Sequence, residues 1–164
     1  MITQLPPTKR LFFRLPNAED LAAYTAYCAS PRAGFVGGPY NDVQAFEKLA
    51  TMIGYWSLRG FGRFVFATHN TGRPIGHMGA LQLCVTEPVE MTWTIRLEDD
   101  EGQGYATEAC SAYLAMARQS LPPLLARIHP DNTASQRLAE RLGGTCDTGA
   151  IAPLWLPTAV TYAM

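Results

Sequence analysis

The sequence predicts a single α/β domain with a mixed, mostly antiparallel central sheet and helices on both faces of that sheet. Residues 61–69 and 75–83 are typical of strands, and they flank Asn-Thr-Gly at 70–72, a turn typical of a β-hairpin. A strand beginning at Val89 leads into a glycine loop and a helix. A hairpin followed by strand, helix and strand predicts a sheet of mixed direction that helices cover.

The amino-terminal part is expected to supply one strand and two helices. Residues 11–15 have the pattern of a strand, and Asn17 can cap a helix over residues 18–29. Proline and glycine then interrupt the pattern, so residues 31–39 are expected to form a loop. A capping-box-like Asn-Asp-Val-Gln begins the helix expected over residues 41–58.

The carboxyl-terminal half is expected to supply helix, strand, helix and a closing strand region. Apolar spacing predicts a helix over residues 105–119, and residues 124–128 form the next strand. The last helix begins at Thr133 and ends at the glycine pair 143–144. The β-branched residues within 158–161 predict one or two closing strands.

Composition favours one compact domain over residues 1–164. A chain of 164 residues with 48% hydrophobic content can bury about two-thirds of its unfolded surface. The formal charge of -1, with scattered arginines, predicts that nucleic acid is not a partner. The sequence has no basic-then-apolar leader and no apolar run long enough to span a membrane. We therefore expect a cytoplasmic protein that does not insert into membranes.

The four cysteines lack the spacing of metal ligands. None belongs to a Cys-x-x-Cys pair, and no histidine lies at zinc-ligand spacing from them, so we expect free, buried thiols and no metal site. The four are Cys28, Cys84, Cys110 and Cys146.

The junction between strand and helix at residues 101–105 is suited to binding a phosphate. Gly102 and Gly104 allow a positive φ and a close approach to a ligand. The first N–H groups of the helix beginning near Tyr105 lack intrahelical partners, and the positive end of the helix dipole favours an anion. An ordinary glycine turn before a surface helix is the alternative.

Nucleotide fingerprints do not match this loop. A P-loop ends in Gly-Lys-Ser/Thr, whereas Tyr105 follows Gly104, and a dinucleotide fingerprint has a third glycine where Thr107 stands. The remaining pattern is Gly-x-Gly-Tyr-Ala-Thr-Glu-Ala after a strand that carries Glu-x-x-Trp. It resembles motif A of the GNAT-superfamily N-acetyltransferases, in which this loop holds the pyrophosphate of acetyl-coenzyme A (acetyl-CoA).

The resemblance covers most of the chain. Residues 9–15 look like the first strand of the ribosomal-protein-alanine acetyltransferase (RimJ/RimL-like) branch, and residues 30–39 are similar to a loop of its bacterial members. Residues 127–135, continuing to Leu142-Gly143, resemble motif B. The similarity spans residues 8–144 and preserves the order of elements. It implies a GNAT-like domain with acetyl-CoA as co-substrate.

The resemblance also implies the cofactor-binding residues. In this family the strand before the loop docks the pantetheine arm, and a backbone N–H near Thr94 would polarise the acetyl carbonyl. Asn132 matches a residue that hydrogen-bonds the pantetheine arm, and it is also a good helix cap. The implied cofactor site comprises Trp93, Thr94, Ile95, Gly102, Gln103, Gly104, Tyr105, Ala106, Thr107, Asn132 and Ser135.

Glu90 is expected to be the general base. Alternation along the strand places Glu90, Thr92 and Thr94 on one face, which we expect to line the cleft. Many members of the family carry at this position a carboxylate that removes the amine proton. An exposed glutamate or a partner of a nearby arginine is the alternative. Ala139 stands where many members have a tyrosine, so Ser135 is the substitute candidate for protonating the leaving thiolate, beside solvent or the product ammonium.

Several other residues have open roles. Glu101 replaces the arginine or glutamine common in the superfamily, and because a carboxylate repels a pyrophosphate we expect it to point to solvent. Arg32 either meets a substrate carboxylate or is an ordinary exposed arginine. His77 and His129 are expected to be satisfied structural histidines. Three aromatic residues either shape the acceptor pocket or fill the core: Tyr40, Tyr55 and Trp56.

Three hypotheses about function follow. The leading one is an acetyl-CoA-dependent N-acetyltransferase that moves an acetyl group, by direct attack in a ternary complex, to the primary amine of a protein N-terminus, an amino acid or a small molecule. The alternatives are a catalytically inactive acyl-CoA sensor on the same fold and a general nucleotide-binding module. The acceptor and the choice between monomer and homodimer stay open.

Overall fold

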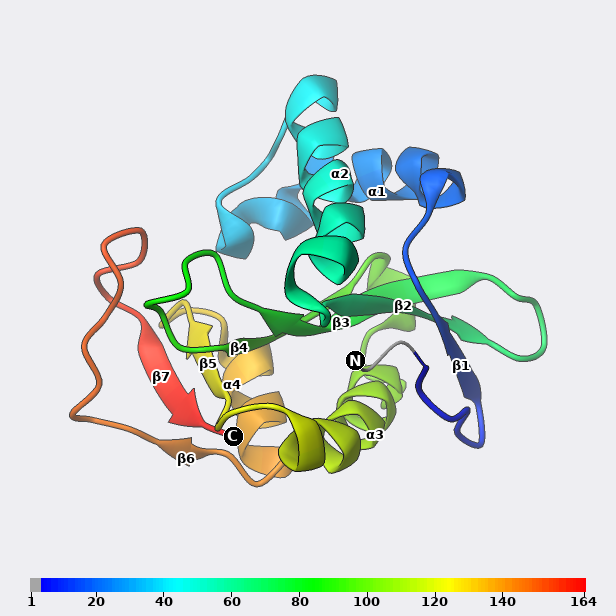
Figure 1. Ribbon diagram of the computed structural model, residues 1–164. Coiled ribbons are helices and arrows are strands. Elements are labelled where there is room, and N and C mark those ends of the chain that lie inside the picture. The colour runs from blue at the N-terminus through cyan, green and yellow to red at the C-terminus, as the bar shows by residue number, and fades with distance from the viewer. Residues whose placement is uncertain (1–3) are drawn as a thin grey trace.

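The computed structural model describes residues 4–164 and contains a seven-stranded sheet in the order β1-β2-β3-β4-β5-β7-β6 (Figure 1). The strands are β1 (Leu11–Arg14), β2 (Arg63–Thr68), β3 (Pro74–Leu81), β4 (Glu90–Ile95), β5 (Leu125–Ile128), β6 (Thr145–Cys146) and β7 (Val160–Ala163). The helices are α1 (Leu21–Ala29), α2 (Asp42–Arg59), α3 (Tyr105–Ser120) and α4 (Thr133–Arg141).

The sheet is mixed and mostly antiparallel, as the sequence predicts. Only the neighbours β4 and β5 run parallel, and their register holds a single pair, Glu90 with Leu125. By contrast, β3 and β4 pair continuously from Leu81↔Glu90 to Gly76↔Ile95. The strands β4 and β5 therefore diverge beyond Glu90 and leave a gap in the sheet, which the sequence does not reveal.

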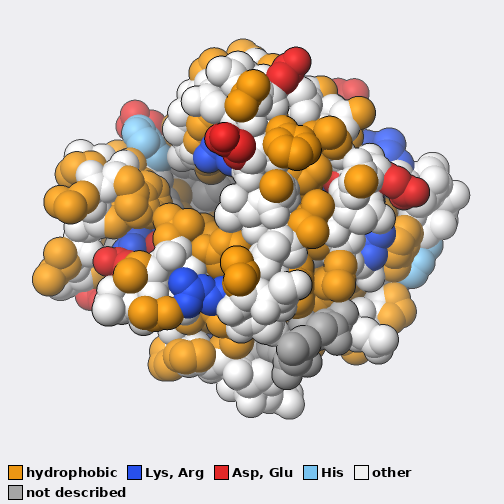
Figure 2. Space-filling model, turned by 45° about the horizontal axis from the view of Figure 1, so that its top comes forward, with side chains coloured by type: hydrophobic (Ala, Val, Ile, Leu, Met, Phe, Trp, Pro, Cys, Tyr) orange, Lys and Arg blue, Asp and Glu red, His pale blue; other side chains and the backbone are white. Residues whose placement is uncertain are grey.

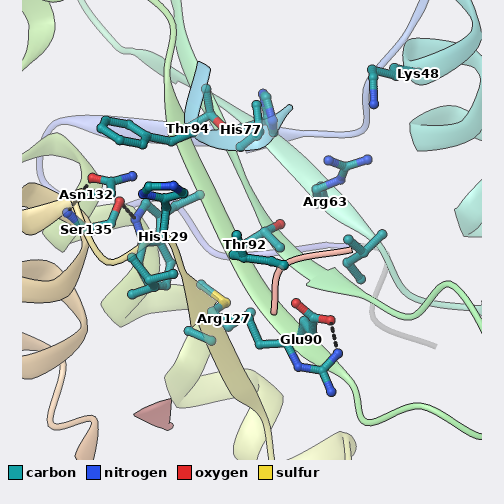
Figure 3. A pocket seen from close by; sticks show the side chains of 18 of the residues that line it. Lys48, Arg63, His77, Glu90, Thr92, Thr94, Arg127, His129, Asn132 and Ser135 are labelled. Atoms are coloured by element: carbon teal, nitrogen blue, oxygen red, sulfur yellow. Dashed lines mark hydrogen bonds and ion pairs between the residues drawn. The ribbon is translucent and has the colours of Figure 1, made fainter. Parts of the chain in front are cut away.

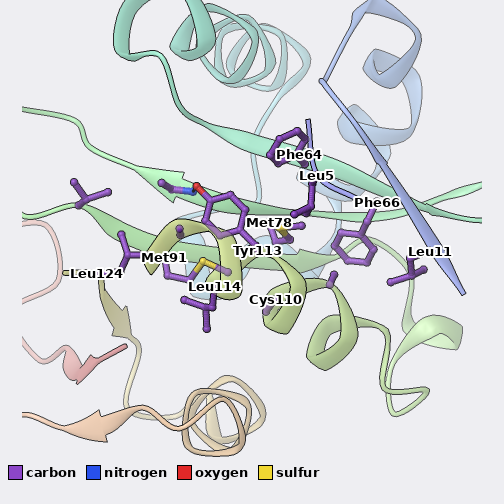
Figure 4. Packing of buried hydrophobic residues seen from close by; sticks show 14 of the residues in the cluster. Leu5, Leu11, Phe64, Phe66, Met78, Met91, Cys110, Tyr113, Leu114 and Leu124 are labelled. Atoms are coloured by element: carbon purple, nitrogen blue, oxygen red, sulfur yellow. The ribbon is translucent and has the colours of Figure 1, made fainter. Parts of the chain in front are cut away.

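Helices cover both faces of the sheet, which confirms the predicted layers. Figure 1 shows α1 and α2 on one face and α3 and α4 on the other. Apolar side chains of β2, β3 and β4 pack against α3, with Phe64, Phe66, Met78 and Met91 around Tyr113 (Figure 4). The buried Tyr113 hydroxyl accepts a hydrogen bond of 3.0 Å from the Ala80 N–H, because a buried phenol needs a partner.

A buried ion cluster fixes the start of α1 to the sheet. Asp20 is 1% exposed and receives hydrogen bonds from Arg14 Nη1 at 2.7 Å and from Arg96 at 3.2 Å. Burial alone would raise the pKa of the Asp20 carboxyl, but hydrogen bonds from Arg14 and the Asn17 N–H, with the charges of Arg96 and Arg14, lower it below its ordinary value. The carboxylate therefore stays ionised and neutralises Arg96.

Three sequence-based expectations need correction. The segment expected as a loop contains a 3-10 helix, Pro31–Val36, because Pro31 favours a helix start and Gly37, with φ 90°, ends it. The expected helix 18–29 begins as a 3-10 turn, Ala18–Asp20, before α1. Of the four cysteines, all free, Cys28 and Cys110 are buried as expected, whereas Cys84 and Cys146 are exposed.

The surface over α2 carries scattered apolar side chains. Figure 2 shows hydrophobic and charged groups interspersed on this face, and the exposed apolar residues of α2 include Val43, Phe46 and Leu58. Within residues 4–164, no helix is long and apolar enough to cross a membrane.

Candidate active site

The glycine loop has the backbone conformation that the sequence predicts. Gly102 and Gly104 have φ of 69° and 78°, in the left-handed region that favours glycine. Gly104 is the N-cap of α3 and offers no side chain to its first turn. The first N–H groups of α3 therefore have no capping side chain, and they lie at the positive end of the helix dipole.

Arg10 of the preceding chain segment holds this loop in place. Its Nη1 donates to the Gln103 carbonyl at 2.8 Å, and its Nε pairs with Glu108 at 2.6 Å. Its guanidinium also lies 4.6 Å from the centre of the Tyr105 ring. Sequence reasoning missed this arginine because almost a hundred residues separate it from the loop.

A groove of about 620 Å³, here called the cofactor groove, runs along the loop. It is lined by every residue of the implied cofactor site except Gln103. Gln103 is exposed, and Arg10 holds it in place by a hydrogen bond to its carbonyl. The residues of that set in the groove are Trp93, Thr94, Ile95, Gly102, Gly104, Tyr105, Ala106, Thr107, Asn132 and Ser135.

Arginines give the cofactor groove positive charge. Arg137 and Arg141 line it from α4, and Arg141 donates to the Thr107 hydroxyl at 3.2 Å. Arg32 also lines it and forms an ion pair with Glu101. The Glu101 side chain is 53% exposed, but it borders the groove and is bound by Arg32, whereas the sequence predicted that it points to solvent. Arg32 therefore neutralises the carboxylate that the sequence places beside the phosphate site.

The backbone N–H groups of β4 that face the gap belong to the neighbours of Thr94. The Arg96 N–H donates to the Ile75 carbonyl of β3 at 2.9 Å, and Thr94 pairs with His77 in the same ladder. Because alternate residues direct their N–H groups to opposite edges, the groups of Trp93 and Ile95 face the gap toward β5. Arg32 indeed donates to the Ile95 carbonyl at 3.2 Å. The N–H groups of Trp93 and Ile95, next to Thr94, can therefore polarise a carbonyl in the gap, whereas the N–H of Thr94 itself faces β3.

A second cavity of about 480 Å³, here called the acceptor cavity, lies on the α1–α2 face of the sheet (Figure 3). Glu90, Thr92 and Thr94 line it together, as their alternation predicts, while Met91 also packs into the core on the other side. The register Arg63↔Gly79↔Thr92 brings Arg63 to the same face. With His77 of β3 and Arg127 of β5, the acceptor cavity therefore holds polar side chains of four strands.

The two cavities meet at the gap between β4 and β5. They share seven lining residues: Tyr27, Phe35, Val36, Trp93, Thr94, Asn132 and Ser135. A molecule that lies along the cofactor groove can therefore bring its end next to a molecule in the acceptor cavity. This junction is where a group can pass from one to the other.

Glu90 is a buried carboxylate paired with an arginine. Its side chain is 10% exposed, and Oε1 accepts a hydrogen bond of 2.9 Å from Arg127 Nη1 (Figure 3). Arg127 also pairs with Glu87 at 3.2 Å. Burial raises the pKa of the Glu90 carboxyl above its ordinary value, although the Arg127 charge opposes the shift. Glu90 therefore has the arginine partner that the alternative interpretation expected, and it still lines the acceptor cavity.

Ser135 is oriented by two neighbours at the junction. Trp93 Nε1 donates to its hydroxyl oxygen at 3.1 Å, and the Asn132 side chain accepts from its backbone N–H at 3.1 Å as the N-cap of α4. Since an indole N–H only donates, the Ser135 proton remains free to point into the cavity. Ala139 is fully buried in the core, so α4 supplies no phenol at that position.

The two cleft histidines differ from each other. His77 is 3% exposed and lines the acceptor cavity, but its Nδ1 has no hydrogen-bond partner within residues 4–164, so it is not the satisfied histidine expected. Burial and the nearby Arg63 lower the pKa of His77 well below its ordinary value, which keeps the imidazole neutral. His129 does have a partner, since its Nδ1 accepts from the Asp131 N–H at 3.2 Å.

The three aromatic residues separate into two groups. Tyr40 lines the acceptor cavity. Trp56 packs edge-on against Phe64 with ring centres 4.7 Å apart, and the Tyr55 hydroxyl donates to the Gln82 carbonyl at 2.7 Å, so both belong to the packing of α2 on the sheet.

Comparison with known proteins agrees with this geometry. Residues 10–145 match the family described as Acetyltransferase (GNAT) domain. The chain belongs to the GNAT acetyltransferase family. A solved acetyltransferase from Agrobacterium tumefaciens str. C58 is 33% identical, with a TM-score of 0.88 over 98% of this chain and 93% of the other. No curated protein matches the chain at a significant level.

More distant GNAT structures share the fold and bind the expected cofactor. RimL, a ribosomal L7/L12 α-N-protein acetyltransferase solved with coenzyme A, is 17% identical, with a TM-score of 0.76 over 98% of this chain and 96% of the other. MccE, the microcin C7 self-immunity acetyltransferase solved with acetyl-CoA and AMP, is 10% identical, with a TM-score of 0.79 over 100% and 97%. Within residues 4–164 of this GNAT protein, no group of three His, Cys, Asp or Glu residues is placed to hold a metal.

Proposed function

We propose that this GNAT protein is an acetyl-CoA-dependent N-acetyltransferase that acts on a primary amine by direct attack in a ternary complex. The observation that carries the proposal is the junction of the two cavities, where Glu90 lies on the acceptor side and Ser135 at the shared boundary. Both substrates can bind at once, and no residue needs to carry the acetyl group.

The cofactor groove suits acetyl-CoA from end to end. The pyrophosphate binds the free N–H groups at the start of α3, with Arg137 and Arg141 adding charge. The pantetheine arm enters the gap beside β4 and takes the place of a neighbouring strand there, with the Trp93 backbone groups and the Ile95 N–H as its hydrogen-bond partners. The Asn132 amide lies at the end of this path. The acetyl thioester then reaches the junction.

Acetyl transfer needs three events there. Glu90 accepts a proton from the acceptor ammonium or amine, directly or through a water, and its raised pKa suits a base. The amine nitrogen attacks the thioester carbon, and a β4 N–H stabilises the oxyanion that forms. The carbon–sulfur bond then breaks, and the thiolate takes a proton from the Ser135 hydroxyl, which regains one from solvent, or from the product ammonium.

A non-catalytic sensor of acyl-CoA is the second candidate. Ala139 favours it, because α4 lacks the phenol that many family members have there, and Glu90 is held by Arg127. The sensor would bind acetyl-CoA in the same groove without releasing its thiol. A general nucleotide-binding module is the third hypothesis, and competition of acetyl-CoA against ATP and NAD separates it from the other two.

The branch, the acceptor and the surroundings are part of the proposal. The motif similarity over residues 8–144 supports the RimJ/RimL-like branch, and GNAT acetyltransferases act on amines. We propose a protein N-terminus, an amino acid or a small amine as the acceptor class and a cytoplasmic monomer or homodimer as the working form.

The decisive experiment measures free thiol released from acetyl-CoA by the full chain with a panel of amines and N-terminal peptides. We expect amine-dependent release, and a loss of about 10²–10⁴-fold in kcat for Glu90→Gln. Glu87→Gln is the matched control, because Glu87 pairs with the same arginine but lies outside the acceptor cavity. Binding without release would favour the sensor, and unchanged turnover in Glu90→Gln would remove this base from the mechanism.

A further inference from the structure

Two cations in the acceptor cavity have no anionic partner. Arg63 and Lys48 both line the cavity, and neither takes part in an ion pair within residues 4–164. The Arg63 side chain also makes no hydrogen bond within that part of the chain, and Lys48 Nζ lies 4.1 Å from the centre of the Tyr40 ring. A guanidinium has five donors, and those of Arg63 are free to bind an anionic ligand in the cavity.

The groups around Arg63 do not include a carboxylate. The acidic groups near Arg63 are the phenols of Tyr24, Tyr27 and Tyr55. Burial raises the pKa of each, so all three are neutral near neutral pH. His77 lines the same wall with its unpartnered, buried Nδ1. One side of the acceptor cavity thus offers two cations and an unused ring nitrogen (Figure 3).

The distance to the base limits the size of a bridging ligand. Arg63 and Thr92 are two strands apart through Gly79, which has no side chain, and Glu90 is two residues from Thr92. With strands about 4.8 Å apart and a rise of about 3.4 Å per residue, the Cα atoms of Arg63 and Glu90 lie about 12 Å apart. Both side chains reach into this span. The space left between the two side chains suits a small ligand whose amine and anionic group are a few bonds apart.

We propose that the acceptor amine carries an oxyanion, a carboxylate or a phosphate, which binds Arg63 while the amine faces Glu90. Lys48 adds charge, and His77 Nδ1 adds a hydrogen bond. This inference rests on the proposed function and adds the substrate class. The planar guanidinium can hold either oxyanion through two parallel hydrogen bonds. The cavity volume of about 480 Å³ is in the range of small-molecule sites, which favours an amino acid or a similar small amine.

The same cations select against other amines. A diamine would place a second positive charge next to Arg63 and Lys48, and a neutral amide would leave the guanidinium unfilled. A site built to bind a charged group discriminates strongly against ligands that lack it. The acceptor cavity therefore specifies the anion as well as the amine.

The test compares thiol release for matched pairs: glycine with glycinamide, phenylalanine with phenylalaninamide, and phosphoethanolamine with ethanolamine. We expect kcat/KM to be about tenfold or more higher for the anionic member of at least one pair, and putrescine to be poor. The first two pairs identify a carboxylate and the third a phosphate. The amine of an amino-acid amide is less basic than that of the free acid, so more of it is deprotonated at a given pH. This difference alone would favour the amide, which is the opposite of the expected result.

Arg63 variants show whether the preference comes from this residue. Arg63→Gln should raise KM for the anionic acceptor about tenfold or more and leave the amide unchanged, and Arg63→Lys should restore part of the difference. Arg118→Gln is the matched control, since Arg118 is exposed on α3, away from both cavities. Equal rates for acids and amides in the wild type, or an equal loss for both in Arg63→Gln, would overturn the inference.

A binding measurement separates this inference from the proposed function. In the presence of coenzyme A, calorimetry compares N-acetylglycine with N-acetylglycinamide, which need no turnover. We expect about tenfold tighter binding of the acid, lost in Arg63→Gln. If no amine releases thiol but this difference is present, the proposed function fails and the anion site stands. If thiol is released but both ligands bind alike in wild type and variant, the anion site fails.

Discussion

Arg96 and Arg63 lie on the same side of the sheet but have opposite surroundings. Arg96, directly after β4, is 3% exposed and meets the Asp20 carboxylate at 3.2 Å. Arg63, at the start of β2, is half-buried beside the acceptor cavity, and no carboxylate within residues 4–164 reaches it. Burial lowers the pKa of the Arg63 guanidinium, and only tyrosine side chains oppose this shift.

The difference separates a charge that the fold needs from one that a ligand can use. The Asp20 cluster joins β1, α1 and β4, so its energy contributes to folding. The Arg63 side chain contributes no such contact, and its desolvation is a cost that the folded state carries. We infer that the first site responds to mutation in stability and the second in substrate binding.

The largest expected effect is on stability at the paired site. Asp20→Asn leaves Arg96 buried without a full counter-charge, and we expect the free energy of unfolding to fall by about 3–5 kcal/mol. Urea denaturation measures it. Glu19→Gln, at the exposed neighbour, is the control and should change little. Arg63→Gln should leave stability unchanged or raise it by about 1 kcal/mol; a loss as large as that of Asp20→Asn would erase the distinction.

Acid should weaken the paired site. The folded-state pKa of Asp20 lies below its ordinary value of 3.8, so its contribution is complete above that pH and is lost as the pH falls through the folded pKa. Stability of the wild type should therefore fall below about pH 4 more steeply than that of Asp20→Asn, by up to about 1.4 kcal/mol per unit of pKa shift. If the free energy of unfolding falls with pH equally in the two proteins, the arginines do not lower the pKa of Asp20.

At the junction, the charge of Arg127 should tune the base. The raised pKa of Glu90 predicts that kcat/KM decreases as the pH falls through that pKa, because the base must be deprotonated. Arg127→Gln removes the charge that lowers this pKa, so the acid limb of the pH–rate profile should move to higher pH. Glu87→Gln removes a charge that raises it, so the limb should move slightly to lower pH. Shifts in the same direction would contradict the assignment.

The smallest effect is expected at the entrance of the cofactor groove. Glu101→Gln removes a negative charge beside the phosphate site and frees Arg32 to meet the pyrophosphate. An exposed pair is worth up to about 1 kcal/mol, so the Kd for acetyl-CoA should fall by about two- to fivefold. Fluorescence or calorimetric titration can measure this. Weaker binding would mean that the Arg32–Glu101 pair itself shapes the groove.

Local sequence signals were enough to predict the layers and the loop. The turn at 70–72, the cap at Asn17 and the glycines 102 and 104 act over a few residues, and the structure places each as expected. The alternation of Glu90, Thr92 and Thr94 likewise follows from the strand period alone.

Features that depend on distant contacts could not be predicted. Arg10 holds the loop from the segment just before β1, and Arg127 meets Glu90 across the parallel pair. The 3-10 helix in the segment 31–39 and the divergence of β4 from β5 depend on how whole elements pack. Arg63 gave no signal in the sequence, because what distinguishes it is the lack of a partner in three dimensions.

The most direct test of acetyl-CoA binding at the α3 N-terminus is a calorimetric titration of the full chain with acetyl-CoA. We expect one molecule to bind the wild type, and about tenfold weaker binding by Gly104→Ala, because alanine at φ 78° costs about 1–2 kcal/mol and displaces the first N–H groups of α3. Gly72→Ala, with φ 68° in the distant hairpin turn, is the matched control and should bind as the wild type does. No uptake by the folded wild type, or equal binding by Gly104→Ala, would contradict the account.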